Sequence, residues 1–172
     1  MGLKNGTVKL EKYNKNWEMM YKEEKANLEK IFGDLAIDIQ HIGSTAIKNI
    51  CAKPIIDIAV GVKSLKEFNK IKKNFLKEPY SIKEDPTDGE ELVIKGYSDT
   101  QFLIHIMEVN SERFKNTILF RDYMNNNEKY AKEYEKIKIY LANKYANNRK
   151  KYTESKNEFI KKILKQARSE IW

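Results

Sequence analysis

The feature that most constrains the fold of this chain is an eight-residue apolar run, Ile55 to Val62, that follows Pro54 and contains one acidic residue, Asp57. Proline is tolerated at the first position of a strand, and a short run rich in β-branched residues is typical of a strand buried in a sheet. Alternation along the strand puts the acidic residue and two small ones on one face: Asp57, Ala59 and Gly61. Four branched aliphatic side chains then lie on the other face.

Asp57 needs an explanation in this setting. A carboxylate among aliphatic side chains costs several kcal/mol unless it is paired, solvated or bound to a metal. Because Ala59 and Gly61 are small, we expect open space above the face that Asp57 shares, which suits a bound ion or ligand. The alternative is a buried aspartate that pairs with a lysine or arginine, or caps a turn.

Helix and strand signals alternate on both sides of this run. Apolar spacing predicts a helix over residues 15–32, capped by Asn14 or Asn16 and ended by Gly33. Period-two alternation predicts a strand at 35–42, a turn with about one helical turn at 43–52, and the strand at 55–62. A capping-box pattern that starts at Ser64 predicts a helix that continues to about Phe75.

Beyond the polar, turn-rich residues 79–89, a hairpin of strands near 91–97 and 101–109 is expected, joined by a turn at 98–100. The rest of the chain is helical in pattern, with helices at about 111–125, 128–147 and 153–170, the last capped by Thr153. These helices must bury their apolar stripes against the sheet or against one another. The sequence therefore predicts an α+β fold: a mixed sheet with flanking helices and a C-terminal helical segment. We expect one domain, 1–172, with a sheet core over about 1–110 and a helical tail over about 111–172.

Composition limits the cellular setting. The longest apolar run is far shorter than a membrane span, no signal peptide is evident, and the single cysteine, Cys51, allows no internal disulfide, so a cytoplasmic protein is expected. Residues 111–172 carry 16 Lys/Arg and 8 Asp/Glu, which accounts for the whole net charge of +8. Such a basic segment suits a nucleic acid or an acidic partner, although the 29 lysines also resemble a compositional bias. The four arginines are scarce enough to indicate specific use of the guanidinium fork.

Two further groups are candidates for chemistry. Gly43, Ser44 and Thr45 follow a strand directly, where backbone N–H groups and hydroxyls can form a phosphate cradle; the alternative is an ordinary turn. His105 lies in the strand at 101–109, and would converge with Asp57 if the two strands are neighbours. A lone histidine in a strand is otherwise a hydrogen-bonded core residue.

At this point the sequence resembles the GrpB family, which is assigned to the nucleotidyltransferase-fold superfamily. The resemblance runs from about residue 8 to residue 168, and is most specific in the segments HIGSTAI at 41–47, AKPIIDI at 52–58 and IHIME at 104–108. It continues in FRDY at 120–123, and in Arg149, Tyr152, Thr153, Lys156 and Phe159.

The resemblance implies a nucleotidyltransferase-like site in which Gly43 and Ser44, with Thr45, hold the phosphates of a nucleoside triphosphate, and Lys53 adds positive charge. It implies Asp57 and His105 as catalytic residues and as ligands of a divalent metal, Mg²⁺ or Mn²⁺. Here the chain departs from the superfamily pattern, because the second acidic position is Ala59 and the third is His105, and Mg²⁺ prefers oxygen ligands.

The helical tail offers further phosphate contacts. Arg149 and Lys156 could close over a phosphate, or could instead form internal bridges to carboxylates. Arg121 is better explained by an internal arginine–carboxylate bridge that fastens the tail to the sheet.

Three functions stay open at this stage. The protein transfers a nucleotidyl group to an unknown acceptor through an altered metal site. It binds a nucleotide, or RNA, as a non-catalytic module with a degenerate metal site. Or it uses Asp57 and His105 for acid–base chemistry as a hydrolase of a small phosphorylated metabolite.

Overall fold

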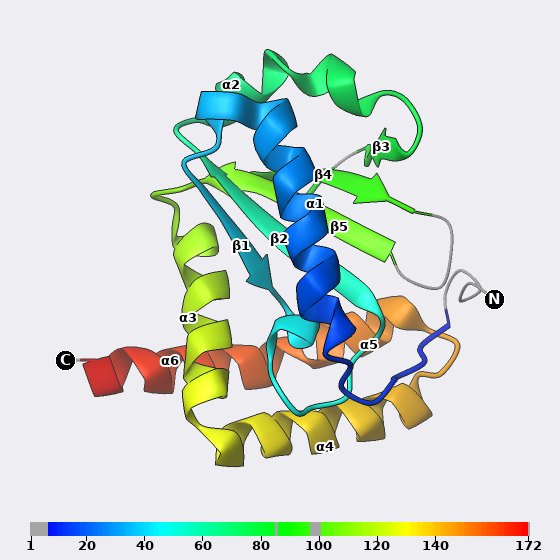
Figure 1. Cartoon of the computed structure of the whole chain (residues 1–172). Helices are drawn as coiled ribbons and strands as arrows, with labels where there is room; N and C mark the ends of the chain where they lie inside the picture. Colours follow the sequence, from blue (N-terminus) through cyan, green and yellow to red (C-terminus); the bar gives the residue numbers. More distant parts are fainter. Residues whose placement is uncertain (1–6, 85, 97–100, 172) are drawn as a thin grey trace.

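A computed structural model describes residues 7–84, 86–96 and 101–171 of the chain, and its centre is a five-stranded mixed sheet in the order β1-β2-β5-β4-β3 (Figure 1). The strands are β1 (Asp38–Ile42), β2 (Ile55–Val62), β3 (Tyr80–Ile82), β4 (Glu90–Lys95) and β5 (Gln101–Glu108). β2 and β5 run parallel in the middle, and the other neighbouring pairs are antiparallel. The predicted α+β class and mixed sheet are confirmed.

Helix α1 (Asn16–Phe32) crosses one face of the sheet (Figure 1). Its buried side chains Trp17, Leu28 and Phe32 pack on the aliphatic face of β2 and β5, which forms the main apolar core. Gly33 ends the helix as predicted, and the Asn14 side chain accepts a hydrogen bond from the Asn16 N–H. The burial of four alternate β2 residues on this side follows the strand alternation read from the sequence.

Helix α3 (Glu112–Asn126) covers part of the opposite face, where the Phe114 ring lies over Gly61. A Cβ built on Gly61 would come within 3.0 Å of that ring, so the missing side chain makes room for the helix. Ala59 is buried in the same cluster, with Ile42, Met107 and Phe114. The expectation of open space above both small residues was therefore wrong; only the part of the face that carries Asp57 is open.

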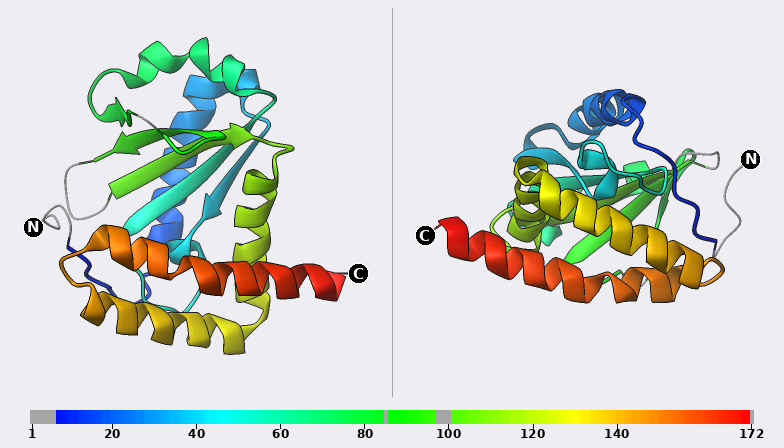
Figure 2. Two further views of the ribbon diagram at one scale, coloured as in Figure 1. Left: turned by 180° about the vertical axis from the view of Figure 1, so that it is seen from behind. Right: turned by 90° about the horizontal axis from the view of Figure 1, so that it is seen from below.

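The last third of the chain forms a small helical bundle beneath the sheet, made of α3, α4 (Glu128–Lys144), α5 (Arg149–Ser155) and α6 (Asn157–Ile171) (Figure 2). Its core includes Ile47 and Ile50 from the loop between β1 and β2, so this loop is held in place by packing against the bundle. Thr153 lies inside α5 rather than at a helix start, and Asn148 caps this helix instead by accepting from the Lys151 N–H. A helix beginning at residue 153 was therefore a wrong prediction.

Three other boundaries differ from the sequence prediction. Strand β1 starts at Asp38 rather than residue 35, because a 3-10 turn, Gly33–Leu35, follows α1. The helix capped by Ser64 stops early as α2 (Leu65–Asn69) and is followed by a 3-10 turn, Lys72–Phe75. The short edge strand β3 was missed within residues expected to be turns. The hairpin of β4 and β5 is confirmed, while its turn at 98–100 lies outside the described residues.

Among the described helices, none combines the length and the apolar character needed to cross a membrane.

Candidate functional site

Asp57 and His105 meet on one face of the sheet because their strands are neighbours. β2 and β5 pair in parallel with Asp57 opposite Leu103 and Ala59 opposite His105. The His105 Nε2 atom lies 2.9 Å from Asp57 Oδ1. The convergence expected from the sequence therefore occurs, and Asp57 is paired with an imidazole rather than with a lysine or arginine.

A second carboxylate holds the other side of the imidazole. Glu90, the first residue of β4, places Oε2 at 3.1 Å from His105 Nδ1. The three side chains come from adjacent strands, with 24% of the Asp57 side chain, 20% of His105 and 10% of Glu90 exposed. His105 is thus enclosed between two carboxylates, and Asp57 presents the most open edge of the group.

The hydrogen bonds define the charge of His105. An ionised carboxylate only accepts hydrogen bonds, so an imidazole bonded to one on each side carries a proton on both nitrogens. Burial alone would lower the pKa of His105, but the hydrogen bonds and charges of Asp57 and Glu90 outweigh it and raise the pKa to about 9. Burial likewise raises the pKa of Glu90, and its bond to His105 more than reverses this, so that the pKa falls below its usual value. The two contacts thus favour the doubly protonated, imidazolium form of His105 between the two carboxylates.

The turn after β1 borders the same carboxylate. A Cβ on Gly43 would lie 2.7 Å from Asp57 Oδ2, and Gly43 has φ +73°, so both space and backbone require glycine. Ser44 lines the pocket beside Asp57, and its hydroxyl lies 3.3 Å from the Tyr134 hydroxyl. Thr45 turns to the far side, where its hydroxyl donates to the Ile55 carbonyl at 3.1 Å. The structure therefore brings Gly43 and Ser44, but not the Thr45 side chain, to the expected site.

Three cations line the opposite side of the pocket: Lys53, Arg149 and Lys156. The Nζ atoms of Lys53 and Lys156 lie 5.1 and 4.7 Å from the centre of the buried Tyr152 ring. Burial is the main cause that lowers the pKa of Lys53 to about 7, and the charges of Lys156 and Arg149 lower it further, against the opposing pull of Asp57. Within the described chain, no carboxylate lies within 4 Å of any of these cationic groups. Arg149 and Lys156 therefore bring positive charge to the pocket, and Lys53 exchanges its proton near neutral pH.

The pocket between these two sides has a volume of about 260 Å³. Ile55 and Leu103 provide an apolar wall between the carboxylate and the cations, while Tyr152 and Thr153 enter from α5. The six expected residues that line it come from β2, β5, the turn after β1 and the α5 region: Ser44, Lys53, Asp57, His105, Arg149 and Lys156. This arrangement suits a small ligand that carries several negative charges.

The donor set suits a divalent metal ion poorly. Mg²⁺ and Mn²⁺ prefer oxygen ligands, and an imidazole binds a metal only through an unprotonated nitrogen. Both nitrogens of His105 are engaged by carboxylates. In the described part of the chain, no group of three His, Cys, Asp or Glu side chains is arranged to hold a metal ion. The expected role of His105 as a metal ligand therefore does not fit its surroundings, because the imidazole lies between the two carboxylates, Asp57 and Glu90, and bonds to both.

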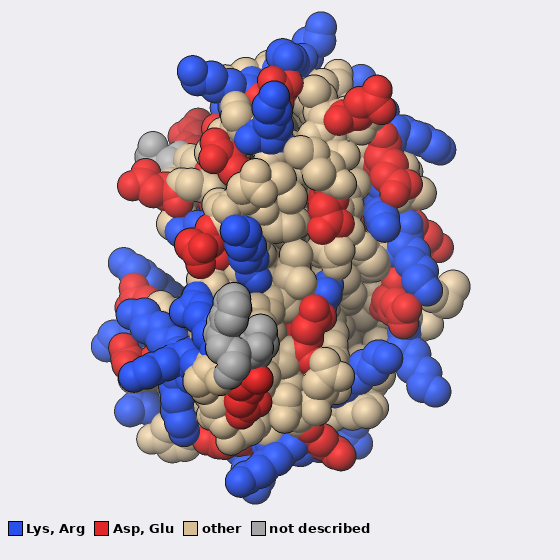
Figure 3. Space-filling view, turned by 90° about the vertical axis from the view of Figure 1, so that its left-hand side faces the viewer, with Lys and Arg blue, Asp and Glu red and all other residues tan. Residues whose placement is uncertain are grey.

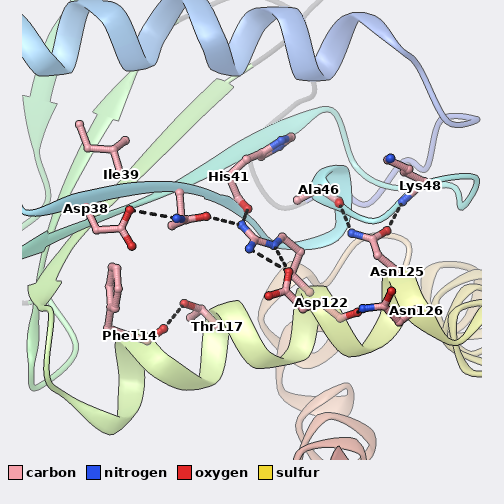
Figure 4. Close-up of polar contacts among 12 residues, drawn as sticks. Asp38, Ile39, His41, Ala46, Lys48, Phe114, Thr117, Asp122, Asn125 and Asn126 are labelled. Atoms are coloured by element: carbon pink, nitrogen blue, oxygen red, sulfur yellow. Dashed lines mark hydrogen bonds and ion pairs between the residues drawn. The ribbon is translucent and has the colours of Figure 1, made fainter.

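Arg121 and His41 lie outside this pocket. Arg121 fastens α3 to β1, since its Nη1 donates to the Gln40 side chain at 2.7 Å and to the His41 carbonyl at 2.9 Å (Figure 4). It also pairs with its neighbour Asp122. Arg121 therefore fastens the tail to the sheet as expected, but through an amide and a backbone carbonyl of β1; its carboxylate partner, Asp122, lies on α3 itself. The His41 ring stacks on Tyr21 of α1 and hydrogen-bonds to Thr45, on the face opposite Asp57.

Glu90 is the main site residue that sequence reasoning missed. Because side chains alternate along a strand, Glu90 lies on the same face of β4 as the buried Leu92. The pairing of Leu92 with His105 then brings Glu90 to the histidine, but this register depends on a turn whose length the sequence does not define.

Comparisons with known proteins agree on one family. A profile of the family described as GrpB protein matches residues 7–166. The Glutamate-rich protein GrpB of Alkalihalophilus pseudofirmus is 42% identical over 171 residues, which is 95% of this chain and 98% of that protein. The solved structure of conserved protein GrpB from Enterococcus faecalis is similar with a TM-score of 0.86 and 29% identity, over 95% of this chain and 99% of that one. A likeness to the solved Cid1 poly(U) polymerase, with a TM-score of 0.44 and 16% identity over 73% and 41% of the two chains, is too remote to bear on function.

Proposed function

The chain belongs to the GrpB protein family, and from its pocket we propose that it binds a phosphorylated small molecule, with a nucleoside triphosphate as the first candidate. The observation that carries this proposal is that Lys53, Arg149 and Lys156 line one pocket and that, among the described residues, none of the three forms an ion pair with a carboxylate. The three side chains are half-buried, and burial lowers the pKa of Lys53, so its positive charge costs stability that a bound anion would offset.

Different parts of the pocket would contact different parts of the ligand. The phosphates lie against the cations, where each charge-assisted hydrogen bond contributes about 1.5–3 kcal/mol. The Ser44 hydroxyl and the Asp57 carboxylate, on the other side, suit the hydroxyl groups of a sugar. Ile55 and Leu103 cover the apolar part between them.

Binding without turnover is the function that this geometry supports best. The nucleotidyl transfer implied by the family resemblance needs carboxylates that hold a divalent ion, and the pocket offers one open carboxylate beside an imidazolium. The proposal therefore uses no metal ion, and corresponds to the nucleotide-binding module with a degenerate metal site. Hydrolysis by Asp57 and His105 is tested in the same samples, by phosphate release.

The basic tail supports a weaker competitor, the binding of RNA. A nucleic-acid surface is typically a continuous basic patch, whereas over most of the side of the molecule in Figure 3 Lys and Arg alternate with Asp and Glu, and basic side chains gather only at the lower left. RNA binding through the tail would fall steeply with added salt and would be insensitive to Lys53.

Calorimetric titration of the whole chain with ATP, pyrophosphate and inorganic phosphate, in EDTA and then in Mg²⁺, tests the proposal. Wild-type protein should bind one equivalent of ATP in EDTA, and Lys156→Met should weaken binding about tenfold or more. Lys151→Met is the matched control, because Lys151 is exposed on α5, which ends just before Lys156, and does not line the pocket. An equal loss of ATP affinity in Lys156→Met and Lys151→Met would contradict the proposal. So would a protein that binds RNA but binds none of ATP, pyrophosphate and inorganic phosphate.

A further inference from the structure

We propose that His105 is a built-in cation of the pocket, occupying the place between the carboxylates of Asp57 and Glu90 that a divalent metal ion would otherwise fill. Glu90 is the positioning residue that keeps it there.

The geometry carries this inference. Asp57, His105 and Glu90 lie on three adjacent strands with their side chains on one face of the sheet, so the two carboxylates approach the imidazole from opposite sides. The separations of 2.9 and 3.1 Å are hydrogen-bond distances on both sides of the ring. Two carboxylates brought together in a largely buried place repel each other unless a cation lies between them. The imidazolium supplies that charge from within the chain.

The other charged groups near this cluster act at longer range. Lys53, Arg149 and Lys156 line the opposite side of the pocket, and Arg113 and Lys83 act on Glu90 through their charges. His105 is the group that hydrogen-bonds to both carboxylates. By neutralising part of their charge, it also reduces the repulsion that a phosphate would meet at the Asp57 side of the pocket.

The consequence for ligand binding rests on the function proposed above: a phosphorylated ligand should bind without a divalent ion, because the cation that such a site needs is already present. The state of His105 itself is independent of any ligand, so it is measured in the ligand-free protein.

Two measurements on the ligand-free chain test the inference. Nitrogen NMR of the wild-type imidazole at pH 7 should show both His105 nitrogens protonated, and Mn²⁺ should not broaden the His105 signals selectively. Replacing the cation with a third carboxylate, His105→Asp, should then create a site that requires a metal. Mn²⁺ should raise the unfolding temperature of this variant by about 4 °C or more, and leave that of the wild type unchanged.

Matched controls test whether the Mn²⁺ response of His105→Asp depends on the three carboxylates or is a general effect of the substitution. His105→Asn removes the charge without adding a carboxylate, and should not respond to Mn²⁺. The double variant His105→Asp with Glu90→Gln should lose most of the response, whereas adding Glu91→Gln instead should keep it, because Glu91 lies on the opposite face of β4 and pairs with Lys72.

The inference is overturned if one His105 nitrogen of the wild type is unprotonated and is broadened by stoichiometric Mn²⁺, which would make the histidine a metal ligand. It is also overturned if folded His105→Asp shows no response to Mn²⁺. If His105→Asp does not fold, the wild-type NMR result decides alone. Because no phosphate is present in these samples, failure here leaves the outcome of the ATP titration untouched.

Discussion

Gly43 and Asp57 are so close that a single added carbon would collide: a Cβ on Gly43 would lie 2.7 Å from Asp57 Oδ2. The turn after β1 thus fixes the carboxylate from one side while His105 holds it from the other. This contact explains why the turn between the first two strands, rather than the strand alone, determines where the open edge of Asp57 points.

Gly43→Ala should therefore destabilise the protein by about 2–3 kcal/mol, since it combines a positive φ with a clash. Gly89→Ala is the matched control: Gly89 also has a positive φ, +86°, but its added Cβ would meet its nearest neighbour at 3.6 Å. Urea unfolding of both variants isolates the cost of the contact with Asp57. Equal losses would show that only the backbone conformation matters.

Lys53→Met should stabilise the ligand-free protein near neutral pH. The lysine titrates near 10.5 when unfolded and at about 7 when folded, so folding favours its neutral form. Its burial therefore costs stability that is complete below about pH 7 and disappears as the pH rises toward 10.5. We expect a gain of about 1–3 kcal/mol at pH 6.5 that shrinks by pH 10, measured by urea unfolding. A variant that is less stable than wild type at pH 6.5 would contradict the account of Lys53 as a strained cation.

The loss of ligand binding should accompany that gain. Replacing a residue that serves binding at a cost in stability should weaken ligand binding and raise the free energy of unfolding. Lys53→Met should thus bind ATP more weakly than wild type while unfolding at a higher temperature. Lys151→Met, exposed on α5, should change neither.

His41 should make the protein sensitive to acid. Burial lowers its pKa to about 4, from 6.5 in an unfolded chain, so the unfolded state binds the proton more readily between these values. The stability contributed by the neutral ring is present above about pH 6.5 and is lost as the pH falls to 4. The slope of unfolding free energy with pH over this window should be smaller in His41→Phe, which keeps an aromatic ring beside Tyr21. An unchanged slope would show that other groups cause the acid sensitivity.

Arg121→Lys tests the attachment of the helical bundle to the sheet. Lysine keeps the charge but lacks the planar fork that donates both to the Gln40 side chain and to the His41 carbonyl (Figure 4). We expect a loss of about 1–2 kcal/mol in unfolding free energy. Arg168→Lys is the comparison on α6: its guanidinium donates to the Asn116 side chain of α3, but this bond is exposed and lysine can also donate to it, so the change should cost less than about 0.5 kcal/mol. Similar costs at the two positions would remove the special role of Arg121.

Local patterns predicted those elements whose signals are complete within a few residues. The apolar run at 55–62 is β2 to the residue, and Gly33 ends α1. The three-residue edge strand β3, within residues 79–89, could not be predicted from the sequence. So short a segment has no periodicity and is defined only by its pairing with β4. Thr153 is a good helix cap by type, yet Asn148 occupies the position where the chain turns into α5.

The parts of the site that depend on the alternation of a single strand could be predicted from the sequence. The parts that depend on tertiary contacts could not. Alternation placed Asp57 on the face of β2 that borders the pocket, and the pairing of β2 with β5 brought His105 to it. The space expected above Ala59 and Gly61 is filled by Phe114, from a helix fifty residues away, which no local pattern indicates. Glu90 joined the site through a strand register that depends on the fold as a whole.

A crystal structure of the protein with ATP in the presence of EDTA tests the central claim most directly. Our account predicts phosphate oxygens within hydrogen-bond distance of Lys53, Arg149 and Lys156, with His105 still held between its two carboxylates. A nucleotide found only on the outer basic faces of α4 or α6, or one that enters this pocket solely with a metal ion bound by His105, would contradict it.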